Sequence, residues 1–233
     1  MTAPSRPLLL GHRGARATNP IPENTLESFD LCLQHGCDGF EFDVRATADG
    51  SLVVCHDETF RGVSVAVISG KELAAWQSRG FLPSLEEVLA RFSEKCVLDM
   101  ELKAFGMEAG LLELLRRHPL ARGFVVTSFL PEVLRTLREL DSSIELGFLF
   151  DDSSCNSGAC STEALCRTLA VQWTLPEWHL LDEALVADLQ AAGKRVGTWT
   201  VNDAADMKRL ASLGVEMLIS DETERLVNTL RVI

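Results

Sequence analysis

Histidine, basic and acidic side chains gather near the start of the chain, at or beside the ends of short apolar runs. Within residues 8–57 they include His12, Arg13, Glu41, Asp43 and His56, together with the amide of Asn24. An imidazole can take up or release a proton near neutral pH, and a guanidinium group suits an anionic phosphoryl oxygen. Carboxylates offer the oxygen ligands that hard divalent cations prefer. This combination predicts acid-base chemistry on an anionic substrate, assisted by a metal ion.

The candidate metal ligands are three carboxylates on two predicted strands. Successive strand residues face opposite sides, so Glu41 and Asp43 point the same way. On the next barrel strand Glu101 shares a side with Asp99 and Lys103. Three unpaired carboxylates close together at one mouth of the barrel would cost on the order of several kcal/mol. A bound Mg²⁺ or Ca²⁺ would remove this cost. Zinc fits less well because no cysteine or paired-histidine pattern accompanies the acids. The alternative is that each acid pairs with an arginine or lysine on a neighbouring strand.

Two of the five histidines are candidates for catalysis. His12 ends the first predicted strand and His56 ends a later one. A single histidine at a strand end is more often structural, but two that flank an acidic cluster favour general acid-base catalysis. We expect His35, His118 and His179 at helix ends or in loops.

Other polar and aromatic residues leave alternatives open. Arg13 and Lys103 would contact a phosphate or form ordinary ion pairs. Asn24 would orient Arg13 or a substrate oxygen, or would only cap a helix. Trp199 would form an apolar wall at the mouth or belong to the core, and Asp221 would anchor loops or contribute to the polar site.

The spacing of apolar residues predicts alternating strands and helices. Eight buried strands are predicted at residues 8–10, 39–44, 97–102, 124–127, 145–150, 170–173, 195–200 and 217–220. Helical spacing between and after them is found at residues 24–35, 84–92, 107–117, 131–140, 162–169, 182–192, 204–213 and 222–230. Eight βα units in one chain predict a closed parallel (β/α)8 barrel, the TIM barrel.

One further strand, at residues 51–56, cannot belong to the parallel ring. The link 47–50 is too short for a crossover, so this strand must return antiparallel to the second strand. Asp49-Gly50 favours a type I′ turn, which would place Asp43 opposite His56. Residues 58–81 are then a short insertion before the third barrel strand, and residues 151–161 are a loop by composition.

Composition limits the class of protein. A chain of 233 residues that is 46% hydrophobic can bury the core of one barrel domain spanning residues 1–233. No apolar run is long enough to cross a membrane and no signal peptide is evident, so we expect a cytoplasmic protein without stable membrane insertion. The seven scattered cysteines suit free thiols. A net charge of −12 argues against nucleic acid as a partner.

Several motifs resemble those of the glycerophosphodiester phosphodiesterase family, and they occur in that family's order. They are HRG (12–14), PENTLESF (22–29), EFDV (41–44), TADG (47–50), VVCHD (53–57), ELK (101–103), GKRVGTWTVN (193–202) and LISD (218–221). The resemblance implies a TIM barrel that hydrolyses glycerophosphodiesters to sn-glycerol 3-phosphate and an alcohol, as part of lipid and glycerol metabolism.

The resemblance also implies roles for particular residues. Glu41, Asp43 and Glu101 would bind Mg²⁺ or Ca²⁺, and His12 and His56 would be the acid-base pair. Arg13, Lys103, Asn24 and Trp199 would contact a small-molecule glycerophosphodiester, whose own glycerol hydroxyl would attack phosphorus to give a cyclic phosphate. One alternative is lysophospholipase D activity, with an apolar groove for the acyl chain lined by Phe60, Trp76 and Phe81. Another is a catalytically silent barrel that binds a phosphodiester or a protein.

Overall fold

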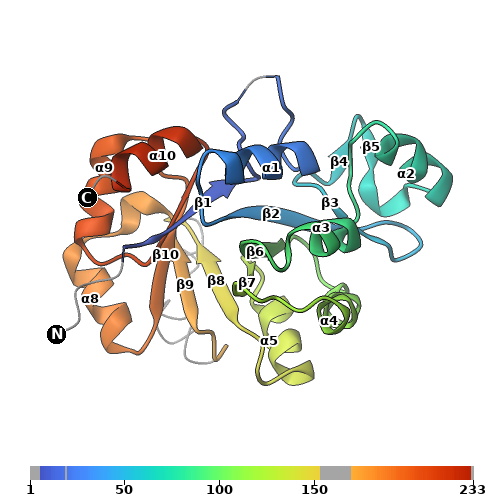
Figure 1. Cartoon of the computed structure of the whole chain (residues 1–233). Helices are drawn as coiled ribbons and strands as arrows, with labels where there is room; N and C mark the ends of the chain where they lie inside the picture. The colour runs from blue at the N-terminus through green and yellow to red at the C-terminus, as the bar shows by residue number, and fades with distance from the viewer. Residues whose placement is uncertain (1–5, 19, 153–168, 232–233) are drawn as a thin grey trace.

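An eight-stranded parallel ring forms the centre of the computed structural model, which describes residues 6–18, 20–152 and 169–231 (Figure 1). The ring strands are β1 (Leu8–His12), β2 (Gly39–Ala46), β6 (Val97–Leu102), β7 (Phe124–Ser128), β8 (Leu146–Phe150), β9 (Trp173–Pro176), β10 (Arg195–Thr198) and β11 (Met217–Ser220). They pair in chain order, and β1 pairs in parallel with both β2 and β11. The ring is therefore closed, and the predicted TIM barrel is confirmed.

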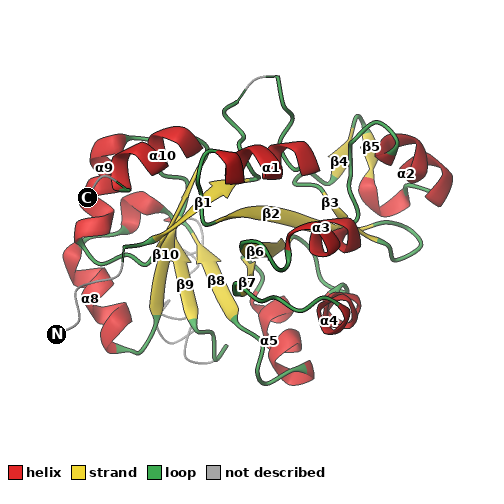
Figure 2. Ribbon diagram, viewed as in Figure 1, coloured by secondary structure: helices red, strands yellow, loops and turns green. Residues whose placement is uncertain are grey.

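Helices surround the ring and bury its outer face (Figure 2). They are α1 (Leu26–Gln34), α3 (Leu85–Phe92), α4 (Glu108–Arg117), α5 (Pro131–Leu140), α8 (Glu183–Ala191), α9 (Ala204–Ser212) and α10 (Thr223–Leu230), with a short 3-10 turn η2 (Trp178–Leu180) before α8. The side chain of Thr25 caps α1 by accepting a hydrogen bond from Ser28 N. Gly36 follows the helix with a φ of 96°, a conformation that glycine adopts without strain.

An aromatic cluster behind β2 fixes which of its side chains face inward. Phe29 of α1 stacks on Phe40 of β2 with ring centroids 4.1 Å apart, and Phe92 of α3 meets Phe40 edge-on at 5.1 Å. Because Phe40 and Phe42 are fully buried on the helix side, the alternation of the strand turns Glu41 and Asp43 into the barrel. The predicted orientation of this strand is confirmed.

The antiparallel strand β3 (Leu52–Val54) pairs with the end of β2, as predicted, but the register differs by one residue from the expectation. Val44 lies opposite Val54, and Cys55 N donates to Asp43 O, so Asp43 does not lie opposite His56. The connection is a three-residue loop closed by Thr47, not a type I′ turn at Asp49-Gly50. Gly50 N donates to Thr47 O and has a φ of 82°, the left-handed position typical of a type I turn followed by a bulge.

The insertion at residues 58–81 is more regular than the sequence indicated. It contains a hairpin of β4 (Thr59–Phe60) and β5 (Val63–Ser64), a 3-10 turn η1 (Val65–Val67) and the helix α2 (Gly70–Gln77), which lie together beside β3 (Figure 1). Arg61 and Gly62 both have positive φ, so the two-residue turn with both central residues left-handed occurs here. A small core joins the insertion to Val53 of β3 and to Cys55, on the face of the strand opposite Leu52 and Val54.

Strand β9 begins three residues later than predicted. Ala170 has a φ of 50°, which lies outside the β region, and the strand instead runs from Trp173 to Pro176. Residues 162–168 of the predicted helix at 162–169 and most of the predicted loop at 151–161 fall outside the described residues.

In the described ranges Cys32, Cys37, Cys55 and Cys96 are buried free thiols. Among the described helices, none combines the length and apolar character that a membrane span needs.

The contact between β2 and β6 gives a prediction about stability. A Cβ atom at Gly39 would lie 1.8 Å from the carbonyl oxygen of Val97 on β6, so Gly39→Ala must push the two strands apart. We expect the free energy of unfolding to fall by about 1–3 kcal/mol, the usual cost of overpacking. Urea unfolding measures this change.

Gly110→Ala is the matched control for this substitution. Gly110 is an exposed residue of α4, where an added Cβ would find its nearest neighbour 3.7 Å away. Alanine in a helix should raise the free energy of unfolding by up to about 1 kcal/mol. A Gly39→Ala protein as stable as the wild type would contradict the close strand contact.

Candidate active site

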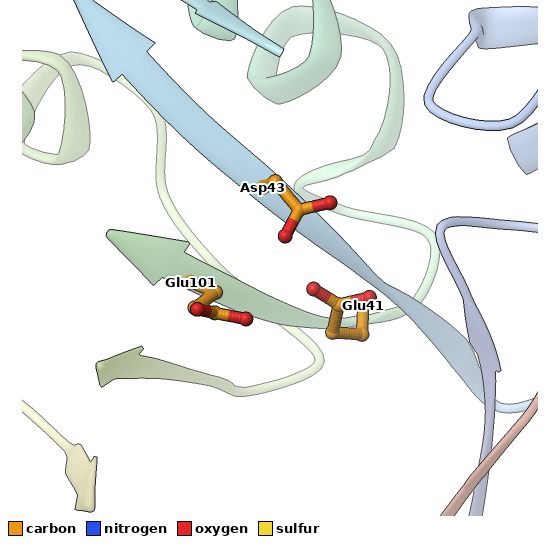
Figure 3. Close-up of side chains that lie close together, drawn as sticks. All are labelled: Glu41, Asp43 and Glu101. Carbon is orange, nitrogen blue, oxygen red and sulfur yellow. The ribbon is translucent and has the colours of Figure 1, made fainter. Parts of the chain in front are cut away.

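Three carboxylates meet inside the carboxyl end of the barrel, as Figure 3 shows. Glu41 and Asp43 come from β2 and Glu101 from β6, and one oxygen of each lies within 4.8 Å of the others. The parallel register explains the cluster, because Asp43 lies opposite Glu101 and Glu41 lies opposite Asp99. The structure thus brings together all three predicted metal ligands and places a fourth acid, Asp99, beside Glu41.

Burial makes the ionised forms of these acids costly. Glu41, Asp99 and Glu101 have exposed fractions of 5%, 0% and 8%. Loss of hydration raises the pKa of Glu41 well above its usual range, and neighbouring Asp43 and Glu101 add to the shift. Burial also raises the pKa of Asp99 to about 7 and that of Glu101 to about 7.

Asp43 differs from the other acids because cations and an amide surround it. Lys103 Nζ lies 3.0 Å from Asp43 Oδ1 and 2.6 Å from Glu101 Oε1. Arg13 Nε lies 3.4 Å from Asp43 Oδ2, and Asn24 Nδ2 donates to the same oxygen at 2.8 Å. Burial alone would raise the pKa of Asp43, but these neighbours lower it.

Asn24 and Arg13 are held in left-handed backbone conformations. Their φ angles are 55° and 54°, and Asn24 N donates to Arg13 O. Of the alternatives left open for Asn24, the structure shows neither helix capping, which Thr25 performs, nor a hydrogen bond of its side chain with Arg13. The amide instead orients Asp43. Arg13 N donates to Glu41 Oε2, so the same loop also fixes the second acid.

His12 is anchored by an acid from the other end of the chain. Its Nδ1 lies 2.8 Å from Asp221 Oδ1, and Asn202 Nδ2 donates to the second oxygen of Asp221 at 2.9 Å. Burial would raise the pKa of Asp221, but these two contacts and Arg16 lower it, so the carboxylate is ionised and can only accept. Nδ1 of His12 therefore carries the proton, and its Nε2, 4.0 Å from Glu41 Oε2, is free for chemistry.

His56 has a similar arrangement on the opposite flank. Its Nδ1 lies 2.8 Å from Asp57 Oδ1. Partial burial lowers the pKa of His56, although the hydrogen bond with Asp57 opposes that shift. Both histidines thus present one ring nitrogen to a carboxylate and keep the other available.

A cavity of about 220 Å³ joins these groups. Its lining residues are His12, Arg13, Glu41, His56, Asp99, Glu101, Lys103, Thr127, Phe129, Leu149, Trp199 and Ile219. Trp199 packs edge-on against Phe129, with ring centroids 5.4 Å apart, and its indole N–H donates to Leu175 O. It is therefore a fixed apolar wall of the cavity, one of the two roles the sequence allowed.

The donor set fits a hard divalent cation. The four buried carboxylates face two cations, Arg13 and Lys103, so two negative charges remain if all the acids are ionised. Oxygen Oε1 of Glu41 is buried without a hydrogen-bond partner in the described part of the chain. Such an atom is costly unless a ligand occupies the space beside it. The pairing of Lys103 with two of the acids shows that the ion-pair alternative holds in part.

Some residues of the site were not identified from the sequence. Glu23 binds Arg13 and Arg16, Asp57 orients His56, and Thr127 donates to Asp99. Glu23 and Asp57 lie inside the motifs PENT and VVCHD, which was the available signal. The strand alternation placed Asp99 beside Glu101, but nothing in the sequence indicated that Thr127 would be its partner.

His35, His118 and His179 lie away from the cavity, as expected. His35 contacts Thr223 of α10, His118 ends α4, and His179 contacts Asp152.

Known proteins are similar to this chain over most of its length. A glycerophosphodiester phosphodiesterase from Caldanaerobacter subterraneus subsp. tengcongensis is 25% identical over 248 residues, covering 96% of this chain and 98% of the relative. One from Bacillus subtilis is 28% identical over 247 residues, covering 92% and 83%.

Solved structures are similar over the same length. The Oleispira antarctica phosphodiesterase in complex with the product sn-glycerol-3-phosphate gives a TM-score of 0.81 at 25% identity, covering 96% of both chains. A Thermotoga maritima glycerophosphodiester phosphodiesterase gives 0.83 at 24% identity, covering 96% of this chain and 98% of the other. The model of the glycerophosphoryl diester phosphodiesterase family matches residues 12–225, and the chain therefore belongs to this family of enzymes.

Proposed function

We propose that this enzyme hydrolyses glycerophosphodiesters to sn-glycerol 3-phosphate and an alcohol, with a bound divalent cation and two histidines. The observation that carries the proposal is the placement of His12 and His56 on the same cavity as the carboxylate cluster. The product bound by the Oleispira antarctica relative supports the choice of substrate class.

The two histidines would divide the proton transfers. Each imidazole is oriented by a carboxylate on Nδ1, which leaves Nε2 to face the substrate. One would accept the proton of the attacking hydroxyl and the other would donate a proton to the leaving alcohol. In this scheme the glycerol hydroxyl next to the phosphate attacks phosphorus, and water then opens the cyclic phosphate.

Glu41, Asp43 and Glu101 would hold the cation, either Mg²⁺ or Ca²⁺. When bound, such an ion supplies charge neutralisation for the phosphoryl oxygens. Arg13 and Lys103 would contact the same oxygens, and Asn24 would contribute by holding Asp43 in place. Trp199 would exclude water from one side of the substrate.

The size of the cavity favours deacylated substrates over lysophospholipids. Its inner end is formed by Asp99, Thr127, Leu149 and Ile219, which are at most 4% exposed. A volume of about 220 Å³ fits a glycerol phosphate but leaves no space there for an acyl chain. The aromatic residues Phe60, Trp76 and Phe81, which the lysophospholipase D alternative requires, pack on one another and on Arg61.

A substrate panel tests this proposed function. We expect release of sn-glycerol 3-phosphate from glycerophosphocholine in a coupled assay, and much slower turnover of lysophosphatidylcholine because its acyl chain cannot enter the cavity. Faster turnover of lysophosphatidylcholine would favour the lysophospholipase D alternative. No phosphodiester cleavage with either cation would favour a silent binding barrel.

Replacing either histidine should remove the proton transfer it performs. For His12→Ala and His56→Ala we expect kcat to fall by about 10²- to 10⁴-fold, with thermal stability near that of the wild type. His118→Ala is the matched control, because His118 lies at the end of α4 outside the cavity and should retain full activity. Retention of most activity in either test variant would exclude that histidine from the mechanism.

Cation binding should stabilise the folded protein, and more so at higher pH. In the metal-free protein the pKa of Glu101 and that of Asp99 are both about 7, above their usual values of 4.5 and 3.8. The folded state then holds protons that the unfolded state releases, so the free energy of unfolding falls as pH rises from about 4.5 to 7. Thermal unfolding in EDTA at pH 5 and pH 8 measures this loss.

Excess Mg²⁺ or Ca²⁺ should reverse that loss at pH 8. At a hundred times Kd we expect the unfolding midpoint to rise by about 5–10 °C. Glu41→Gln, which removes one ligand and one charge, should show a much smaller rise. An equal rise in the variant and the wild type would mean that the cation binds elsewhere.

A further inference from the structure

The inner end of the cavity holds an acidic group that the proposed reaction does not use. Asp99 faces inward from β6, one inward-facing position deeper than Glu101, and lies opposite Glu41 in the strand register. The residue is fully buried, yet it lines the same cavity as His12 and Trp199. It is therefore placed to contact a substrate that enters from the mouth.

Thr127 fixes one oxygen of this carboxylate. Thr127, on β7, donates its hydroxyl proton to Asp99 Oδ1 at 2.7 Å, and both residues are fully buried. Oδ2 of Asp99 has no hydrogen-bond partner among the residues that the structure describes. A buried carboxylate oxygen without a donor is costly, so this position favours a ligand that supplies a hydrogen bond.

The surroundings restrict the chemistry of that ligand. Glu41 lies beside Asp99 in the register and Glu101 lies one inward-facing position nearer the mouth, so an anionic phosphoryl group would be repelled from the inner end. Arg13 and Lys103, which attract phosphoryl oxygens, lie with Asp43 nearer the mouth. The apolar side chains of Leu149 and Ile219 line the same cavity as Asp99. A neutral hydroxyl on a short carbon chain meets all these conditions.

We infer that Asp99, held by Thr127, accepts a hydrogen bond from the terminal hydroxyl of the substrate's glycerol and so selects glycerol over shorter or deoxygenated alcohols. This inference rests on the proposed function. When the phosphate lies at the mouth, the hydroxyl on the middle carbon of glycerol lies beside phosphorus. The terminal hydroxyl then extends deepest into the cavity. Asp99 is then a specificity-determining residue and Thr127 its positioning residue.

A pair of substrates that differ only in this hydroxyl tests the inference. The kcat/KM of the wild-type enzyme, loaded with cation, is measured for glycerophosphocholine and for the 2-hydroxypropyl ester of phosphocholine, which keeps the attacking hydroxyl. A hydrogen bond to a charged group predicts a preference of about 10- to 100-fold for the glycerol substrate. In Asp99→Leu the ratio of the two kcat/KM values should fall toward one, even if the variant is less active on both substrates.

Conservative substitutions separate recognition from a general structural role. Asp99→Asn keeps an acceptor oxygen and should retain part of the preference. Thr127→Val removes the donor that orients Asp99 and should lower the ratio, whereas Thr127→Ser should preserve it. A ratio near one in the wild type, or an unchanged ratio in Asp99→Leu, would overturn the inference.

Binding of the reaction products gives a second measurement that needs no variant. Calorimetry on the wild type should show sn-glycerol 3-phosphate binding about 10-fold or more tightly than 2-hydroxypropyl phosphate. Equal affinities would overturn the inference even if Asp99→Leu failed to fold. Failure of the proposed function is distinguishable, because the wild type would then release no sn-glycerol 3-phosphate from any substrate.

Discussion

The mutual repulsion of buried carboxylates is the constraint on which the rest of this site depends. Parallel pairing of β2 with β6 places Glu41 beside Asp99 and Asp43 beside Glu101, so the register alone brings four acids into the barrel. Like charges in a poorly hydrated interior cost several kcal/mol, on the order of a protein's net stability. The fold limits this cost with the Arg13 backbone N–H, the Asn24 amide, the Lys103 ammonium and the Thr127 hydroxyl. These contacts do not neutralise all of the negative charge, and a divalent cation would balance the remainder.

Rigid packing behind the acids holds them in this unfavourable arrangement. The stacked rings of Phe29 and Phe40 and the edge-on ring of Phe92 lie directly outside β2. Because that face of the strand is fully buried, β2 cannot rotate to release Glu41 and Asp43 into solvent. Closure of the ring likewise holds His12 in place. Its partner Asp221 follows the last strand, 209 residues later in the chain, and reaches His12 only because the ring closes. The geometry of the candidate site therefore depends on barrel closure as well as on local sequence.

Strand periodicity was sufficient to predict the barrel and the inward direction of Glu41, Asp43 and Glu101. It could not give the register of the β2–β3 hairpin, because Asp49-Gly50 is compatible with a two-residue and with a three-residue loop. In the folded chain Gly50 is left-handed but Asp49 is not, and Val44 pairs with Val54, which is the three-residue loop. The start of β9 was missed because the left-handed conformation of Ala170 leaves no pattern in the sequence.

Partners that come from distant segments were beyond sequence reasoning. Asn24 could have capped α1, but Thr25 performs that role and the amide reaches Asp43 on β2. The carboxylate of Asp99 was visible as an inward-facing group, whereas its orphaned oxygen and its Thr127 partner depend on the pairing of β6 with β7. Such contacts are set by the three-dimensional packing of neighbouring strands.

The central claim is that one cation binds among Glu41, Asp43 and Glu101 at the mouth of the barrel. Anomalous diffraction from crystals soaked in Mn²⁺, as a stand-in for Mg²⁺ or Ca²⁺, tests it most directly. The account predicts a single strong peak within roughly 2.0–2.6 Å of an oxygen of each acid. An empty cluster, with Lys103 still paired to Asp43 and Glu101 at saturating Mn²⁺, would contradict it.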